Sequence, residues 1–241
     1  YKRQDLMLKT IQESNFNESE RIQELLGFIS ANNEKSIIQN GHILSMSSAA
    51  AQINNIASTN DFTGGIRFIS NTSSLYKNIT KEKNIDSYID SLQAIKSKIS
   101  NDPIYTFIAS SIDLQDLKIK SDFDKNSNFE KILFLESQKD SYAWITGSQV
   151  CFCAEAFPSV DIDHNDSAAL TVLGAVLRNG YLHSAIREKG GAYGAGASQD
   201  SKNKTFKFFS YRDPNCIETF NEFKRSIDWG ISNIKTSHLD E

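Results

Sequence analysis

The sequence has little of the chemistry that marks disulfide-stabilised, membrane-spanning and nucleic-acid-binding proteins. It has three cysteines in 241 residues. Cys151 and Cys153 lie two apart on one predicted strand, where they are poorly placed to bond each other, and Cys216 is distant in sequence. We therefore predict no disulfide framework and expect these thiols to act as small buried hydrophobes.

Long apolar runs and excess positive charge are also missing. No stretch of about 18 apolar residues occurs, so no membrane-spanning helix is predicted, and the first residues lack the apolar core of a secretory signal. The net charge of −4 gives no general attraction to nucleic acid or anionic membrane. A soluble protein, intracellular or organellar rather than secreted, is expected.

Histidine spacing argues against a metal site. The four histidines, His42, His164, His183 and His238, form no pair one helical turn apart, which is the usual basis of a catalytic zinc site. We therefore predict no metal ligands in this chain, and we interpret His164 and His183 as polar core or surface residues. No Gly-x-Ser-x-Gly nucleophile elbow is present either.

What the sequence does contain is a change of period that divides it into two parts. Apolar residues recur at helical spacing over 5–30, 36–60, 66–79 and 84–99, with a break at Gly64-Gly65. A β-branched and aromatic strand follows at 104–112, and a polar stretch at 118–128 is typical of a linker. We predict a mostly helical domain at 1–117 and a second domain at 129–241.

The second part predicts a sheet with helices on it. We expect a strand at 149–157, helices at 168–177 and 181–189, a hairpin of 193–198 with 204–212, and a helix that begins at Pro214. The fold class is therefore α+β, with helices on one face of a mainly antiparallel sheet. Since no closing strands follow, we expect the second domain to be incomplete and the fragment to self-associate through exposed apolar surface.

The glycine-rich run from Gly190 to Gly196 follows a predicted helix and precedes a strand. Phosphate-binding loops have the opposite order, so that a helix N-terminus faces the anion. Small residues on a strand instead permit the close approach of an extended peptide. Arg187 and Tyr193 flank the run and could donate hydrogen bonds to it. The plain alternative is an Arg paired at a helix end and a Tyr packed in a core.

Three stretches carry a family resemblance. They are Tyr181-Leu-His-Ser-Ala-Ile-Arg-Glu-Lys-Gly-Gly-Ala-Tyr-Gly-Ala-Gly-Ala197, Phe208-Phe-Ser-Tyr-Arg-Asp-Pro-Asn215 and Ile217-Glu-Thr-Phe220. Together they resemble the fourth domain of the presequence protease subfamily of pitrilysin (insulinase)-type zinc metallopeptidases. The helices before residue 99 look like the end of that subfamily's third domain.

The resemblance implies a pitrilysin/mitochondrial-processing-peptidase-like fold and a role in peptide degradation. Members of the family enclose a chamber between two homologous halves. Their N-terminal half carries a His-x-x-Glu-His zinc motif, and zinc-bound water attacks the peptide with the motif Glu as base. The C-terminal half supplies an Arg and a Tyr that hold the substrate, and these match Arg187 and Tyr193. Gly190, Gly191 and Gly194 are then expected to line the peptide.

The resemblance leaves two functions open. The chain could be the substrate-holding part of an active zinc endopeptidase, with peptide substrate and the N-terminal catalytic half of the same polypeptide as its partners. Alternatively, it could belong to a non-catalytic paralogue that acts as a peptide-binding or scaffold subunit. In both cases we expect zinc, where present, to lie in the full-length protein. The chain alone, which lacks the zinc motif, is expected to be an inactive fragment.

Overall fold

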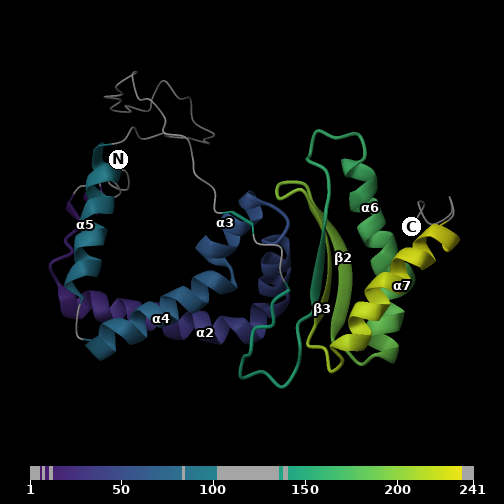
Figure 1. Cartoon of the computed structure of the whole chain (residues 1–241), viewed down its shortest axis with the longest axis horizontal. Helices are drawn as coiled ribbons and strands as arrows, with labels where there is room; N and C mark the ends of the chain where they lie inside the picture. The colour runs from purple at the N-terminus through teal and green to yellow at the C-terminus, as the bar shows by residue number, and fades with distance from the viewer. Residues whose placement is uncertain are drawn as a thin grey trace. The chain divides into compact units, whose positions relative to one another are not determined.

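The computed structural model of the chain describes residues 6, 9–10, 13–82, 85–101, 136–137 and 141–234 (Figure 1). Contacts divide the chain into two units, one of residues 1–26 with 76–132 and one of residues 27–75 with 133–241. The predicted strand at 104–112 and the predicted linker at 118–128 lie outside the described residues. The predicted domain boundaries therefore stay predictions.

The N-terminal part is helical, as its periodicity predicts. Its helices are α2 (Ser19–Ala50), α3 (Asn55–Gly64), α4 (Ile66–Glu82) and α5 (Asp86–Asn101). The predicted break between 30 and 36 is wrong, because α2 continues through this polar stretch, which contains neither Gly nor Pro. The break comes later, where the Asn54 side chain caps α3 by accepting a hydrogen bond from the Ala57 amide at 2.9 Å.

The break at Gly64-Gly65 is confirmed, and a buried ion pair accompanies it. Asp61 is 1% exposed, and its Oδ2 accepts a hydrogen bond from Arg67 Nε at 2.7 Å. Its Oδ1 accepts the Ile66 amide at 3.2 Å, which caps the start of α4. A Cβ at Gly65 would lie 2.0 Å from Asp61 Oδ1, so only glycine leaves room for this carboxylate.

The sheet has three antiparallel strands in the order β1-β3-β2. They are β1 (Ala154–Pro158), β2 (Gly194–Asp200) and β3 (Thr205–Tyr211). The predicted hairpin is thus confirmed, with its turn at 201–204. The predicted strand at 149–157 begins too early: β1 starts at Ala154, and Cys151 makes only an isolated bridge to Asp213.

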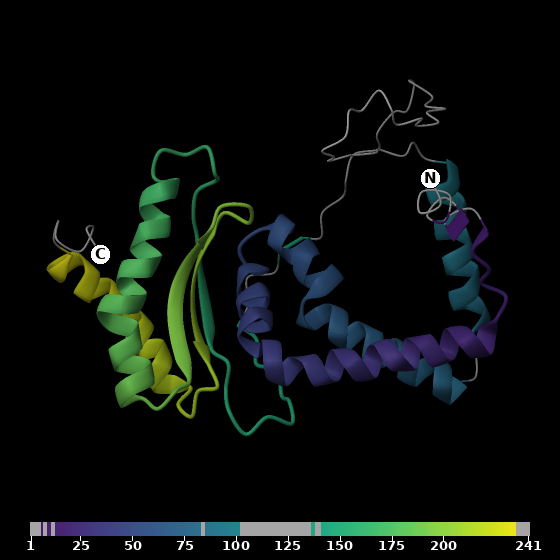
Figure 2. The ribbon, with the colours of Figure 1, turned by 180° about the vertical axis from the view of Figure 1, so that it is seen from behind.

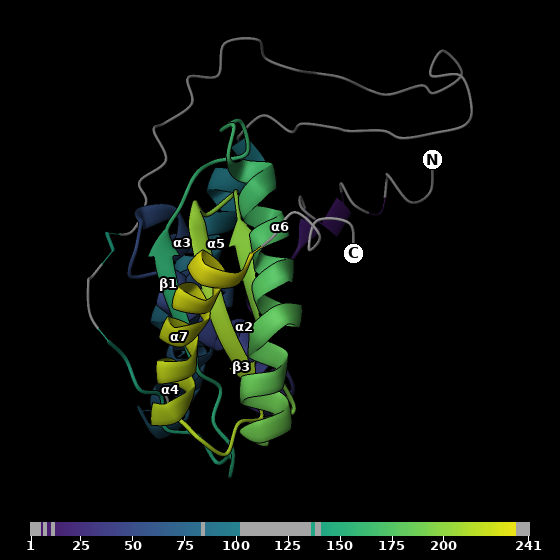
Figure 3. The same ribbon diagram turned by 90° about the vertical axis from the view of Figure 1, so that its right-hand side faces the viewer.

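Helices α6 (Ser167–Leu177) and α7 (Ile217–Asn233) cover one face of the sheet together with the π-helix η2 (Arg178–Lys189) (Figure 3). The predicted gap between helices 168–177 and 181–189 is absent, since α6 passes directly into η2 (Figure 2). Gly180 is needed there for packing, because a Cβ would lie 2.2 Å from the Trp229 ring. The last helix starts at Ile217, three residues after the predicted start at Pro214.

Alternation along β3 separates the two faces of the sheet. Phe206, Phe208 and Ser210 are buried on the face under the helices, where Phe208 stacks on Phe223 of α7 at 5.5 Å. The intervening side chains are partly exposed and reach the other face, where the Phe209 ring lies 6.0 Å from that of His42 on α2. The α+β class is confirmed.

Candidate substrate-binding site

The predicted glycine turn lies between η2 and β2 and reverses the chain in a few residues. The Gly190 amide donates to the Arg187 carbonyl at the end of η2, and the Ala192 amide donates to the Ile186 carbonyl at 3.1 Å. Gly191 has φ +80°, a left-handed conformation that favours glycine. The turn therefore places the residue after Ala192 at the start of β2.

This turn brings Arg187 and Tyr193 together. The Arg187 guanidinium carbon lies 5.9 Å from the centroid of the Tyr193 ring, within cation–π range. Tyr193 is 66% exposed. Arg187 Nη1 lies 3.2 Å from His183 Nε2, and within the described part of the chain it has no carboxylate partner. Both side chains thus lie on the surface with donors available, instead of being an ion pair at a helix end and a core tyrosine.

A second aromatic–cation pair continues this surface, and sequence reasoning did not assign it to the site. The Tyr193 amide donates to the Tyr211 carbonyl at 3.0 Å, and the two rings meet edge to face at 5.6 Å. Arg212 places its guanidinium carbon 5.3 Å from the Tyr211 centroid. Its φ of +49° is uncommon for a residue other than glycine, and such strain is concentrated at functional sites. We call Arg187, Tyr193, Tyr211 and Arg212 the arginine–tyrosine row.

His42 supports the row from beneath. Its ring meets the Tyr211 ring edge to face at 4.7 Å, and burial lowers its pKa below the ordinary 6.5. Phe152 lies on the same side, with its ring 5.8 Å from Tyr211. Gly41 permits this approach, since a Cβ there would be 2.4 Å from the Phe152 ring. His42 therefore acts as a neutral packing group.

The turn after β3 braces the glycine turn. Asn215 Nδ2 donates to the Gly190 carbonyl at 2.6 Å. The buried Asp213 accepts hydrogen bonds from the Asn215 amide at 2.8 Å and from the Thr219 hydroxyl at 2.6 Å. These contacts fix the segment on which Arg212 lies relative to the end of η2. The signal in the sequence was the Tyr-Arg-Asp-Pro-Asn stretch, which carried part of the resemblance but no residue role.

Gly194 differs from the two glycines of the turn. A Cβ at Gly194 would meet no atom within 4 Å, whereas a Cβ at Gly190 would lie 2.6 Å from the Ile186 carbonyl oxygen. Gly194 starts β2, which pairs with β3 on one side and forms an edge of the three-stranded sheet. Its open Cβ position next to Tyr193 leaves space for another chain.

The described residues do not fit a catalytic zinc ion. No group of three or more His, Cys, Asp or Glu side chains among them could hold a metal. In the row itself, the nearest candidate ligand, His183, is bonded to Arg187 and lies 3.5 Å from Glu188. No chemical step through zinc can be built from this part of the molecule.

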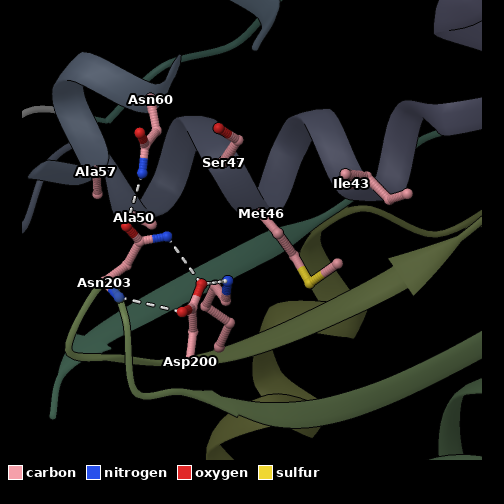
Figure 4. Close-up of a pocket in the computed structure, with 9 residues that line it drawn as sticks. Ile43, Met46, Ser47, Ala50, Ala57, Asn60, Asp200 and Asn203 are labelled. Carbon is pink, nitrogen blue, oxygen red and sulfur yellow. Dashed lines mark hydrogen bonds and ion pairs between the residues drawn. The ribbon is translucent and has the colours of Figure 1, made fainter. Parts of the chain in front are cut away.

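A cavity of about 220 Å³ lies elsewhere in the same unit, between α2–α3 and the β2–β3 hairpin (Figure 4). Its polar groups bind one another: Asp200 accepts Lys207 Nζ at 2.7 Å and Asn203 Nδ2 at 2.9 Å. Burial opposes ionisation of Asp200, but these bonds outweigh it and lower its pKa. Asn60 in turn donates to Asn203 at 2.9 Å. The cavity contains no residue of the row, and its polar groups join the helices to the hairpin.

Comparisons with known proteins give a family for both parts of the chain. Residues 2–75 match a family model of a peptidase-associated domain, and residues 143–238, which contain the row, match "PreP C-terminal domain". Mitochondrial presequence protease of Yarrowia lipolytica is 28% identical over 94% of this chain and 24% of its own length. That of Saccharomyces cerevisiae is 28% identical over 96% of this chain and 26% of its own length.

Shorter alignments are more similar. The presequence protease of Emericella nidulans is 50% identical over 32% of this chain and 7% of its own length, and that of Mus musculus is 44% identical over 37% and 8%. The chain spans about a quarter of the length of the relatives that it matches throughout. Among the described residues, no helix is long and apolar enough to cross a membrane.

Proposed function

This chain belongs to the presequence protease family, whose C-terminal region it matches, and we propose that it is the substrate-holding part of a zinc endopeptidase that degrades short unfolded peptides. The observation that carries the proposal is the surface pairing of Arg187 with Tyr193, six positions apart in sequence and 5.9 Å apart in space. Both retain donors toward solvent, where a peptide in an enclosed chamber would lie.

Each residue of the site would have a separate task. The Arg187 guanidinium and the Tyr193 hydroxyl would donate hydrogen bonds to the substrate carbonyl and to the oxyanion that forms from it. Gly190 and Gly191 would hold the turn that sets these two side chains. Gly194, with nothing over its Cβ position, would let the peptide backbone come close to the edge strand β2.

Tyr211 and Arg212 would extend the same surface along the peptide. Arg212 has no ion pair among the described residues, so its charge is free to meet a carbonyl or carboxylate of the substrate. The edge-to-face contact of Tyr211 with Tyr193 would fix the direction of the Tyr193 hydroxyl.

Zinc and the general base would lie on the other half of a longer polypeptide, since the residues described here do not fit a metal. When bound there, zinc supplies an activated water that attacks the amide. The partners would be that catalytic half and a peptide. The names of the relatives place those proteins in mitochondria, and we propose an organellar location for this one.

The test is turnover of a fluorogenic peptide by the full-length enzyme. We expect Arg187→Ala and Tyr193→Phe each to lower kcat by about tenfold to a thousandfold, the effect of one lost oxyanion donor. Lys189→Ala is the matched control, because it removes an exposed cation from the same helix end. Unchanged kcat in both site variants would refute the role, as would chelator-sensitive cleavage by the 241-residue chain alone.

A further inference from the structure

The three cysteines, which the proposed function does not use, come together at one place in the fold. Cys153 Sγ lies 3.8 Å from Cys216 Sγ, although the two residues are 63 positions apart. Cys151 is close enough to Cys216 for the two thiols to influence each other. All three are free thiols; Cys153 is buried, and Cys151 and Cys216 are exposed.

Main-chain contacts hold this arrangement in place. The Cys151 amide donates to the Asp213 carbonyl at 2.8 Å, and the Asp213 amide donates back at 2.9 Å. Cys153 exchanges similar bonds with Ser210, which donates its amide to the Cys153 carbonyl at 2.9 Å. Residues two apart on an extended segment face the same side, so both thiols point toward Cys216 at the start of α7.

We propose that Cys153 and Cys216 form an oxidisable pair, in which a hydroperoxide oxidises exposed Cys216 and buried Cys153 closes a disulfide. In the first step the Cys216 sulfur takes a hydroxyl from the peroxide, which is reduced to water or an alcohol. In the second step the Cys153 sulfur attacks the Cys216 sulfur, the S–O bond breaks, and the hydroxyl leaves with the Cys153 proton as water. The two thiols lose two electrons, and the peroxide gains them.

The geometry assigns the order of the two steps. Burial raises the pKa of Cys153 to about 12, so this thiol stays protonated and shielded and is a poor first target. Cys216 is the exposed member of the pair. A disulfide requires the sulfurs to approach from 3.8 Å to about 2 Å, which side-chain rotation at the exposed residue can supply.

A disulfide here would also tether the turn behind the arginine–tyrosine row. Cys216 follows Asn215, whose side chain holds the Gly190 carbonyl at 2.6 Å. Joining Cys216 to Cys153 would fix this turn to the segment that enters β1. The Gly191 and Ala192 amides, which are bonded to the end of η2, should then exchange with solvent more slowly.

The experiment is oxidation of the 241-residue chain with hydrogen peroxide, followed by peptide mass mapping without reduction. We expect a Cys153–Cys216 crosslink, reversed by dithiothreitol, and a rise in Tm of about 5 to 10 °C, because the bond closes a long loop. Hydrogen exchange at residues 190–192 should slow in the oxidised form. Cys216→Ser, at an exposed position that should not disturb folding, should lose the crosslink and the Tm shift.

Cys151→Ser is the matched control, because it removes the third thiol and should leave both effects unchanged. A Cys151–Cys216 crosslink would overturn the assignment of Cys153 as the resolving residue. Oxidation that stops at Cys216 without any crosslink, or that yields only crosslinked dimers, would overturn the pair itself. None of these readouts depends on peptidase activity, so their failure leaves the proposed function to its own test.

Discussion

Gly191→Ala should destabilise the turn between η2 and β2 by a cost that comes almost entirely from the backbone. The residue has φ +80°, and the atom nearest to an added Cβ is Pro214 Cγ at 3.6 Å, which is ordinary contact. A left-handed conformation costs a residue with a side chain about 1–2 kcal/mol. We therefore expect the free energy of unfolding to fall by about that amount, which is a loss of about 2 to 8 °C in Tm.

Gly194→Ala is the matched control within the same segment. Its Cβ would meet no atom within 4 Å, and its φ is not positive. Because glycine weakens a strand, alanine here should leave stability unchanged or raise it by about 0.5 kcal/mol. In the full-length enzyme it should nevertheless raise KM, since the new methyl group would occupy the space proposed for the peptide.

Urea denaturation of the two variants, followed by circular dichroism, separates these effects. The reasoning about the turn is refuted if Gly191→Ala is as stable as the native chain, or if Gly194→Ala loses as much stability as Gly191→Ala. The first result would mean that the turn adopts another conformation, and the second that β2 tolerates no side chain at its start. An unchanged KM in Gly194→Ala would count against peptide binding along β2.

Two further predictions concern the parts of the unit that hold the site. Arg67→Ala should lower the free energy of unfolding by about 3 kcal/mol, because it leaves the buried Asp61 carboxylate unpaired; Arg21→Ala, at an exposed helix pair, should change it by less than about 1 kcal/mol. The first prediction fails if both variants unfold at the same urea concentration. Burial lowers the pKa of His42 below 6.5, so the unfolded chain takes up this proton first, and stability should fall as the pH drops below that value. His42→Phe should flatten the pH dependence in that window, and an unaltered slope in urea titrations would contradict the reasoning.

Local chemistry explains which elements could be predicted. The hairpin, the stop at Gly64-Gly65 and the turn at Gly190-Gly191 depend on residues that are neighbours in sequence. The start of β1 does not. Alternation begins at Gln149, but pairing runs only from Ala154, opposite Phe209, to Pro158, opposite Thr205. A strand that pairs with a distant partner ends where that partner ends.

The gap predicted near Gly180 was wrong for a similar reason. Glycine in an apolar pattern suggests a helix end, but here it admits the Trp229 ring of α7. The polar stretch of α2 was misjudged because polarity alone does not stop a helix that lacks Gly and Pro. In each case a contact or a continuity that no short window contains decides the structure.

The candidate site divides along the same line. Arg187 and Tyr193 were found because they flank a local turn and carry a family motif. Tyr211, Arg212 and His42 were missed because they reach the site through strand register and through α2. Tyr211 lies beside Tyr193 only because the β2–β3 register pairs Gly194 with Tyr211.

This register also separates what holds the fold from what forms the site. In β3, Phe208 is in the core while Phe209 and Tyr211 face His42. A slip by one residue would exchange the two sets, so that the aromatic support of Tyr193 would be buried under α7 and the core phenylalanines would be exposed. The buried apolar face of β3 therefore fixes the register, and the register in turn places the arginine–tyrosine row. Selection for a stable core would in this way maintain the site geometry, even though core and site share no side chain.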